Sequence, residues 1–182
     1  SEYLRGVTYG NGLFVTVGKS GIILTSTDGT TWTQKTSRTS NNLYGVTYGN
    51  NTFVTVGGSG IILTSSDGIF SWTKRTSGTS NGLWEVTYGN GLFVTVGQSG
   101  TILTSTDGTT WTKRTSGTSK YLYGVTYGNG TFVTVGQSGT ILTSSDGITW
   151  DNRTSGTTVN LSGVTYGNST YVIVGNSGTI LT

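Results

Sequence analysis

The sequence predicts an all-β fold, a single β-propeller domain that spans residues 1–182. Three observations support this prediction. The motif VTYGN recurs at spacings of 39, 40, 39 and 39 residues, each repeat contains four short runs rich in β-branched residues, and no stretch shows a helical period. Four short antiparallel strands in a unit of about 40 residues are typical of one propeller blade.

The repeat units begin near residues 1, 40, 80, 119 and 158. Their VTYGN motifs start at Val7, Val46, Val86, Val125 and Val164. One extra residue lies in the string DGIFSW, where the other copies have DGTTW or DGITW. The third and fourth units are nearly identical from their VTYGN motifs onward, which indicates recent duplication or deliberate construction.

Turn residues separate the four expected strands of each unit. In the fourth unit these strands are expected at 122–127, 131–135, 140–144 and 148–153. Asn-Gly and Asp-Gly pairs lie between strands, and both pairs tolerate the positive φ that tight hairpin turns require. Blades that close around an axis bury both of their faces, so runs such as FVTV need not alternate cleanly between apolar and polar residues.

The fourth type of strand, which begins at a tryptophan, occurs once less often than the others. The first three types occur five times each, and the chain stops at Thr182 after a third strand. We therefore expect five four-stranded blades, one of which lacks its outer strand. Two alternatives remain open: the chain is part of a larger ring, or another chain completes a partial ring. An uncovered third strand would be an exposed sheet edge.

An acid, a glycine and a tryptophan recur in a nearly fixed frame, first as TSTDGTTW at 25–32. The aspartate can accept hydrogen bonds from backbone N–H groups, the glycine can adopt the left-handed conformation, and the tryptophan can cover the blade edge. We expect a structural turn, because calcium needs more than one carboxylate per loop and an active site is normally built once. This set comprises Asp28, Trp32, Asp67, Trp72, Asp107, Trp111, Asp146 and Trp150.

The motif SxDGxxW resembles the Asp-box, or BNR, repeat of sialidase-type propellers. The wider unit FVTVGxSGxILTSxDGxxW is similar to repeats of photosystem II assembly-factor propellers, and the resemblance extends over nearly the whole chain. It implies propeller blades that carry the motif in the peripheral turn between the third and fourth strands, away from an active site. The usual Asp-box has one more residue between the acid and the tryptophan, so the local turn can differ.

The inventory of reactive residues argues against an enzyme. Charged residues make up 9% of the chain, against roughly 25% in ordinary domains, and histidine and cysteine are absent. Glu85 is the one acid in an unusual place, because it occupies a slot that holds glycine in the other four units. A lone carboxylate cannot hydrolyse a glycoside, which requires a pair. We expect no catalytic residue, cofactor or metal, and interpret Glu85 as drift from the glycine.

The charge pattern excludes nucleic acid and membrane insertion from the expected partners. The net charge of +3 is small and spread along the chain, and no segment approaches the ~20 apolar residues of a membrane span. The repeated cations Lys35, Arg75, Arg114 and Arg153 are interpreted as protection of the outer strands against aggregation. The residues do not identify a compartment, although a secreted or cell-surface location is favoured.

A ligand site is expected on the face formed by the blade-to-blade connections and the turns between second and third strands. These segments carry hydroxyls and amides beside a recurrent aromatic slot. Such groups suit a sugar, which has hydrogen-bonding edges and an apolar C–H face. The candidate ligand-binding residues are Tyr44, Trp84, Tyr123, Asn41, Asn81, Gln98 and Gln137. The alternative is that the loops are solvated and the aromatic residues pack between blades.

The sequence therefore predicts a non-catalytic binding or scaffold propeller, and in its more specific form a multivalent carbohydrate-binding, lectin-like protein. The expected partners are glycans, another protein, or a second copy of the chain that completes the missing strand. Two other functions stay open. One is a designed or recently duplicated repeat protein without a ligand, and the other is a protein-interaction fragment of a larger propeller protein.

Overall fold

The computed structural model of the chain describes residues 3–182. Its strands form four four-stranded antiparallel sheets and one three-stranded sheet, with the strands of each sheet in chain order. Each sheet is one propeller blade. The predicted five blades, and the outer strand that one of them lacks, are therefore confirmed.

The first blade comprises β1 (Leu4–Gly10), β2 (Leu13–Gly18), β3 (Ile23–Ser26) and β4 (Thr33–Lys35). The second comprises β5 (Leu43–Gly49), β6 (Thr52–Gly57), β7 (Ile62–Ser65) and β8 (Thr73–Arg75). The third comprises β9 (Leu83–Gly89), β10 (Leu92–Gly97), β11 (Ile102–Ser105) and β12 (Thr112–Arg114). The fourth comprises β13 (Leu122–Gly128), β14 (Thr131–Gly136), β15 (Ile141–Ser144) and β16 (Asp151–Arg153), and the fifth β17 (Leu161–Gly167), β18 (Thr170–Gly175) and β19 (Ile180–Leu181). Short 3-10 turns join the second and third strands: η1 (Lys19–Gly21), η2 (Gly58–Gly60), η3 (Gln98–Gly100), η4 (Gln137–Gly139) and η5 (Asn176–Gly178).

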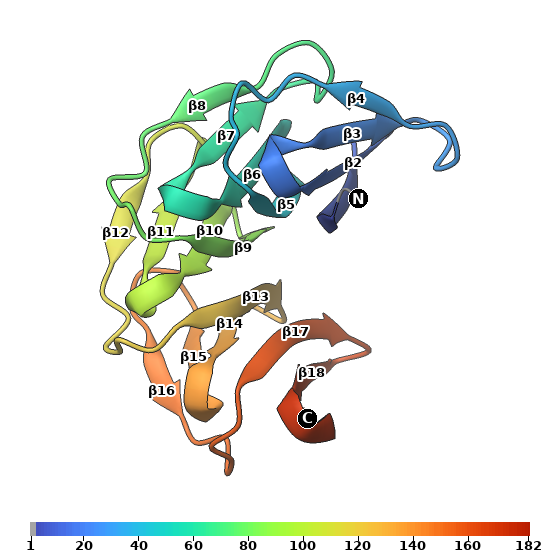
Figure 1. Ribbon diagram of the computed structural model, residues 1–182. Coiled ribbons are helices and arrows are strands. Elements are labelled where there is room, and N and C mark those ends of the chain that lie inside the picture. Colours follow the sequence, from blue (N-terminus) through green and yellow to red (C-terminus); the bar gives the residue numbers. More distant parts are fainter. Residues whose placement is uncertain (1–2) are drawn as a thin grey trace.

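The five blades form an open arc rather than a closed ring (Figure 1). Successive blades pack through their first strands, in the order β1, β5, β9, β13 and β17. The first and fifth blades lie at opposite ends of the arc, on the two sides of its opening. The expectation that every blade buries both faces holds for the three middle blades and is wrong for the terminal two, because no other blade within residues 3–182 covers their outer faces.

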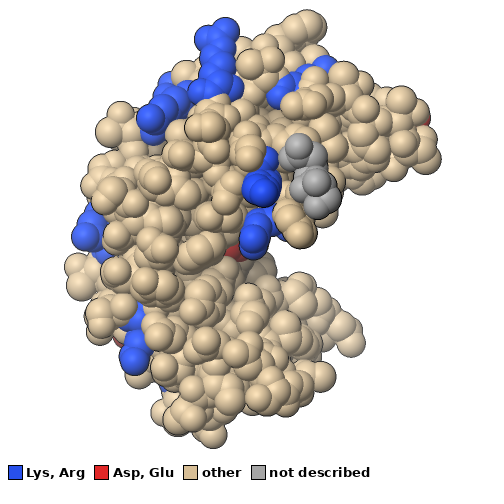
Figure 2. Space-filling view, in the orientation of Figure 1, with Lys and Arg blue, Asp and Glu red and all other residues tan. Residues whose placement is uncertain are grey.

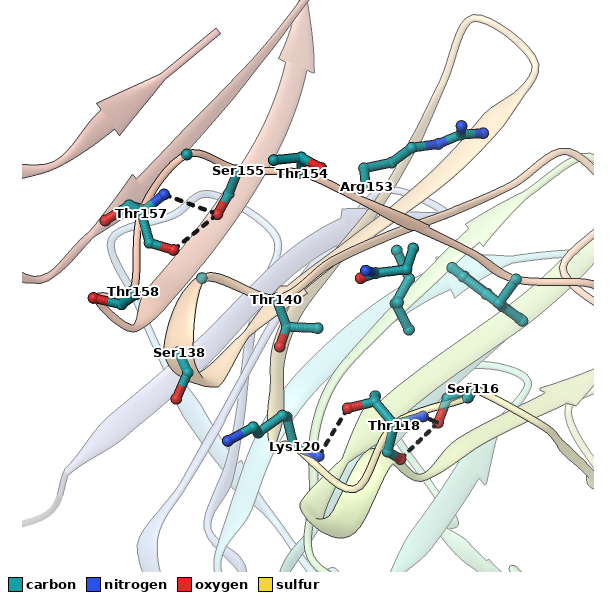
Figure 3. Close-up of a pocket in the computed structure, with 16 residues that line it drawn as sticks. Ser116, Thr118, Lys120, Ser138, Thr140, Arg153, Thr154, Ser155, Thr157 and Thr158 are labelled. Atoms are coloured by element: carbon teal, nitrogen blue, oxygen red, sulfur yellow. Dashed lines mark hydrogen bonds between the residues drawn. The ribbon is translucent and has the colours of Figure 1, made fainter.

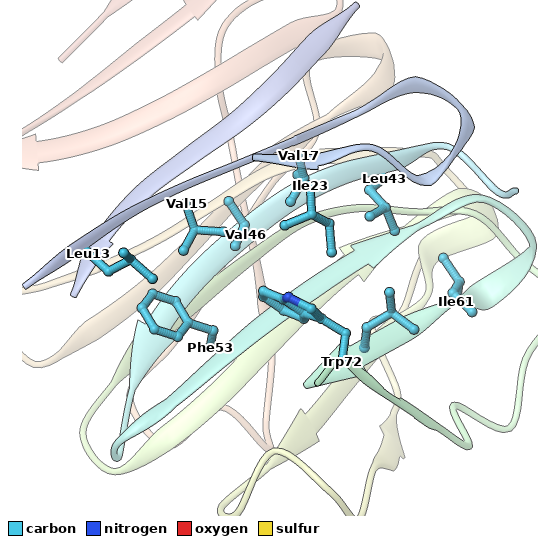
Figure 4. Packing of buried hydrophobic residues seen from close by; sticks show 10 residues of the cluster. Leu13, Val15, Val17, Ile23, Leu43, Val46, Phe53, Ile61 and Trp72 are labelled. Carbon is cyan, nitrogen blue, oxygen red and sulfur yellow. The ribbon is translucent and has the colours of Figure 1, made fainter. Parts of the chain in front are cut away.

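Each blade-to-blade interface repeats one pattern of apolar contacts. Between the first two blades, Val15 and Val17 of β2 pack against Val46 of β5, Phe53 of β6 and Trp72 (Figure 4). All five side chains are buried. Clusters of equivalent residues fill the next three interfaces. Apolar burial of this kind is the main favourable term in folding, so the core of the arc lies between the blades rather than within any one of them.

A tyrosine of each later blade covers a glycine of the blade before it. A Cβ atom placed on Gly49 would lie 2.1 Å from the ring of Tyr88, which is closer than any real Cβ contact. The same pairing joins Gly10 to Tyr48, Gly89 to Tyr127 and Gly128 to Tyr166, at 2.1 to 2.2 Å. The tyrosine and the glycine are consecutive residues of VTYGN, so each copy of the motif supplies a tyrosine for one neighbouring blade and a glycine for the other.

The turn between the third and fourth strands closes on an aspartate in each complete blade. In the third blade, Asp107 Oδ1 accepts hydrogen bonds from the backbone N–H groups of Thr109 and Thr110 at 2.7 and 2.8 Å, and from Ser105 Oγ at 2.9 Å. The Thr109 hydroxyl donates to Oδ2 at 2.6 Å. These bonds, with that hydroxyl first, hold the pKa of Asp107 well below its usual range. Asp28, Asp67 and Asp146 accept equivalent backbone bonds.

The inserted residue in the second blade changes this turn in one respect. Trp32, Trp111 and Trp150 each donate their indole N–H to the carbonyl of the turn glycine. The indole nitrogen of Trp72 is buried and has no hydrogen-bond partner within residues 3–182. The longer DGIFSW string separates Trp72 from its glycine by one more residue, which accounts for the lost bond.

Replacing Asp107 by alanine should lower the free energy of unfolding by about 1 kcal/mol at pH 7, because the turn loses its hydrogen-bond acceptor. The exposed neighbour Thr106→Ala is the control. The folded pKa is lowered, so the stabilisation is complete above the unfolded pKa, near 3.9, and is lost as the pH falls towards the folded value. Urea unfolding should show that the difference in unfolding free energy between wild type and Asp107→Ala becomes smaller in acid. An equal difference at pH 7 and pH 2.5 would contradict this role of Asp107.

Replacing Gly89 by alanine should lower the free energy of unfolding by roughly 1–3 kcal/mol, because its methyl group would overlap the Tyr127 ring. Gly167 is the matched control, since a Cβ atom at this equivalent position in the fifth blade meets nothing within 4 Å. Chemical denaturation at low protein concentration measures both variants. Equal effects of the two substitutions would show that the tyrosine contact is not the cause.

Candidate functional site

Side chains from all five blades meet in one cavity on the inner side of the arc. The cavity has a volume of about 420 Å³ and lies where the first strands of the blades begin. Figure 2 shows the notch that the arc encloses, with basic side chains beside it and acidic atoms at its floor. The residues that line the cavity are Arg5, Tyr44, Trp84, Glu85, Tyr123, Asn160, Ser162 and Asn176.

A β-bulge points one residue of each blade at this cavity. In the second blade Leu43 pairs with Gly57 and Gly45 pairs with Val56, so Tyr44 is the extra residue between two pairs. The same irregularity leaves Arg5, Trp84, Tyr123 and Ser162 as the extra residues of the other four blades. A bulge bends the strand and redirects a side chain, which explains why these five residues converge. The hydrophobic pattern of the sequence contains no sign of the bulge.

Three of these residues, Arg5, Tyr44 and Trp84, form a row across the boundaries between the first three blades. The rings of Tyr44 and Trp84 stack with their centroids 4.7 Å apart, and the Arg5 guanidinium lies 5.3 Å from the Tyr44 centroid. Tyr123 contacts Tyr121 edge-on at 6.4 Å. Tyr44 therefore contacts side chains of both neighbouring blades. The aromatic residues thus pack between blades and also line the cavity.

The four amides predicted to bind a ligand make hydrogen bonds within the blades. Asn41 Nδ2 donates to the carbonyl of Gly58 at 3.3 Å, and Asn81 Nδ2 donates to the hydroxyl of Thr101 at 2.9 Å. In the same region, Gln98 Oε1 accepts from the Gly82 N–H at 2.9 Å and Gln137 Oε1 from the Tyr121 N–H at 3.3 Å. These amides hold the connections into the second, third and fourth blades against the 3-10 turns of those blades.

The amides that line the cavity are Asn160 and Asn176 of the fifth blade. Sequence reasoning did not select them, although Asn176 occupies the same repeat position as Gln98 and Gln137. Asn160 Oδ1 accepts a hydrogen bond from the Ser138 N–H at 3.0 Å, which leaves its amide N–H₂ group available to a ligand. The signal that could have found Asn176 is this repeat position, which holds an amide in the third, fourth and fifth units.

Glu85 lies next to Trp84 on the floor of the cavity. Its carboxylate occupies space that Gly45 of the neighbouring blade leaves free, since a Cβ atom at Gly45 would lie 2.8 Å from Glu85 Oε1. Burial raises the pKa of Glu85 to about 7, and a hydrogen bond from the Val86 N–H at 3.0 Å opposes this shift. Near neutral pH the carboxyl group can therefore donate or accept a hydrogen bond. No second carboxylate lines the cavity among the described residues.

A larger hollow lies between the connections that enter and leave the fourth blade (Figure 3). Its volume is about 870 Å³, and serine and threonine predominate in its lining. Ser116 Oγ donates to the carbonyl of Thr118 at 3.1 Å, and Ser155 makes the same bond with Thr157, so these hydroxyls already pair with backbone. A related hollow occurs in the first blade. We therefore regard these hollows as a repeated surface groove. We place the candidate site in the cavity on the inner side of the arc, which we call the axial cavity.

Within residues 3–182 no three acidic, histidine or cysteine side chains lie close enough together to hold a metal ion. The helices found in those residues are too short and too polar to cross a bilayer.

No family model and no curated protein sequence matches the chain. Solved structures are similar to it: YCF48 bound to a D1 peptide (19% identity, TM-score 0.76) and YCF48 from Cyanidioschyzon merolae (16%, 0.74). The chain is covered to 98% in both matches and spans 62% and 66% of those proteins. The computationally designed Ika8 protein is similar at 12% identity and a TM-score of 0.75, covering 97% of this chain and 57% of Ika8. Such likeness establishes the β-propeller fold.

Replacing Glu85 by glutamine should remove a pH dependence of stability. The folded pKa of about 7 lies above the ordinary value of 4.5, so the contribution of Glu85 to stability is complete below pH 4.5 and is lost as the pH rises through 7. The expected loss is about 2 kcal/mol after allowance for partial exposure. Glu85→Gly, which restores the residue of the other units, is the matched control. Parallel wild-type and Glu85→Gln curves of unfolding free energy against pH would contradict the burial of this carboxyl group.

Proposed function

We propose that this chain is a non-catalytic binding propeller that takes a peptide segment of a partner protein into the axial cavity. The observation that carries the proposal is the convergence of one bulge residue from every blade on a single cavity. A surface to which each of the five blades contributes one bulge residue provides a site that no single blade has.

The chemistry of the cavity suits a short extended peptide. Arg5 offers a guanidinium that can pair with a carboxylate, and Trp84 and Tyr123 offer apolar surface for a side chain. Asn160 and Asn176, across the cavity, carry amide groups that match the donor and acceptor of a peptide bond. The volume of about 420 Å³ lies in the range of sites for small ligands, so the occupant is a short segment rather than a folded surface.

Charge favours an acidic or C-terminal segment. Arg5 is permanently charged, whereas the raised pKa of Glu85 leaves its carboxyl group partly neutral near pH 7. The cavity is then electropositive at neutral pH. A propeller of similar fold, YCF48, has been solved with a D1 peptide, which supports a peptide as a ligand class that this architecture can accept.

The absence of catalysis is part of the proposal. Glu85 is the only acid that lines the cavity among the described residues, and the chain has no histidine to act as a base. General acid–base chemistry requires a second group placed against the first. A site with one carboxyl group, one guanidinium and several amides can bind and orient a ligand without transforming it.

A glycan is the second candidate ligand. The combination of Ser162, Asn160 and Asn176 with the surfaces of Trp84 and Tyr123 supports it, because a sugar needs hydrogen-bonding groups beside an apolar plate. The five bulge residues are an arginine, a serine, a tryptophan and two tyrosines, and they converge on one cavity. A glycan would therefore be bound at a single site, and avidity among equal sites is not required.

Binding to peptide and glycan arrays tests the two ligand classes together. We expect the wild-type chain to bind peptides that carry a carboxylate, and Trp84→Ala and Arg5→Gln to weaken that binding at least ~10-fold. The matched control is Phe70→Ala, which removes an exposed aromatic ring from the β7–β8 turn of the second blade. Circular dichroism confirms that each variant folds. Binding of glycans alone would favour the second candidate, and wild-type levels of peptide binding by Trp84→Ala and Arg5→Gln would overturn the axial site.

A further inference from the structure

The outer face of the first blade is an exposed copy of a face that is buried elsewhere. Leu4, Val7, Tyr9 and Trp32 occupy the repeat positions that Leu43, Val46, Tyr48 and Trp72 hold in the second blade. Val7 is 66% exposed and Val46 is 6% exposed. Trp32 is 38% exposed and Trp72 is 4% exposed. The first blade therefore presents the complete set of side chains with which a blade packs on its predecessor.

The fifth blade exposes the opposite half of the same interface. Val174 and Ile180 occupy the positions of Val135 and Ile141, which pack against the fifth blade from the fourth. Val174 is 46% exposed, whereas Val135 is fully buried. The preceding blades contribute residues of their second and third strands to these contacts, so the fifth blade has the required set although its fourth strand is lacking.

A knob on one face matches a hole on the other. At every internal boundary a tyrosine ring lies where a Cβ atom of the preceding blade's glycine would be. Tyr9 is the equivalent tyrosine of the first blade, and 59% of its surface is exposed. Gly167 is the equivalent glycine of the fifth blade, and a Cβ atom there would meet nothing within 4 Å. The chain thus carries one unfilled hole and one unpaired knob, at opposite ends of the arc.

We propose that a second copy of this chain docks its first blade on the fifth blade of the first, with Tyr9 seated over Gly167. Continuity with the four internal interfaces supports this occupant. The required residue types are already present on the two exposed faces, and the one difference, Thr170 at the position of Leu13, is also found in working interfaces as Thr52 and Thr131. The chain itself therefore carries both halves of the contact.

This contact is head-to-tail, because two different faces meet. A head-to-tail contact produces a closed ring where the rotation between copies closes, and an open string where it does not. The exposed apolar surface at both ends would be buried in either case, which removes a patch of the kind that monomeric proteins rarely expose. The proposal concerns the faces of the terminal blades and does not depend on the ligand of the axial cavity.

Sedimentation velocity of the wild-type chain over a concentration range up to ~100 μM tests the association. We expect a species larger than the 19.0 kDa monomer. Val7→Lys and Val174→Lys should each weaken the association at least ~10-fold, because each places a charge in an apolar contact. Gly167→Ala should weaken it as well, by filling the hole under Tyr9. Thr112→Lys on β12, an exposed position of the middle blade, adds the same charge and should associate as wild type does.

Mixing two variants distinguishes this contact from a symmetric one. Val7→Lys retains an intact fifth-blade face, and Val174→Lys retains an intact first-blade face. Neither variant should associate alone, and an equimolar mixture should form a dimer through the one remaining pair of intact faces. A monomeric wild-type chain at the highest concentration would overturn the proposal and leave the two faces to another polypeptide. Association of wild type without recovery in the mixture would overturn the head-to-tail arrangement.

All three substituted side chains lie at positions where the structure leaves room in the single chain, so the variants should fold. Melting temperatures measured at low concentration, where wild type is dissociated, should agree among wild type, Val7→Lys, Val174→Lys and Gly167→Ala. A variant that loses its cooperative melting transition is replaced by Tyr9→Lys, which alters the same contact from the other side. Association of Tyr9→Lys at the wild-type concentration would contradict the proposed seat over Gly167.

Discussion

The contact between a tyrosine of one blade and a glycine of the blade before it determines most of this architecture. The glycine allows the tyrosine ring to lie directly on the backbone of the neighbouring first strand, at a place where any side chain would collide with it. This close approach brings Val15 and Val17 against the next blade's Val46 and lets the apolar core form between blades. Each blade is stabilised by its neighbours, as in other repeat proteins. The same contact is incomplete at the two ends of the arc. The first blade exposes the tyrosine, Tyr9, and the fifth blade exposes the glycine, Gly167.

Much of the fold could be predicted because the repeat is so regular. The strand order, the number of blades and the missing outer strand follow from counting VTYGN and the tryptophan strands. The opening of the arc could not be predicted in this way. It depends on the angle between adjacent blades, which is set by the volumes of the packed side chains and not by the spacing of motifs. The exposure of Val7 and Val174 is the visible result.

The site could be predicted only in part. An aromatic residue recurs at one repeat position in the sequence, as Tyr44, Trp84 and Tyr123, and all three side chains line the cavity. The bulge that turns them toward it depends on the pairing of whole strands, which a residue pattern does not contain. The amides that are available to a ligand were more difficult to predict. The sequence does not show that a side chain such as Gln98 already accepts a hydrogen bond from the backbone. The space that Gly45 leaves for the Glu85 carboxylate, 40 residues further along the chain, is visible only in the structure.

A double-mutant cycle on Gly49 and Tyr88 tests the central contact most directly. Gly49→Ala should destabilise the chain by steric overlap with the ring, and Tyr88→Ala should destabilise it by leaving a cavity. In the double variant the methyl group occupies space that the ring has vacated. The combined loss in unfolding free energy should therefore be smaller than the sum of the single losses by at least ~1 kcal/mol. Strictly additive losses would contradict the account, since they would mean that the ring and the glycine do not interact.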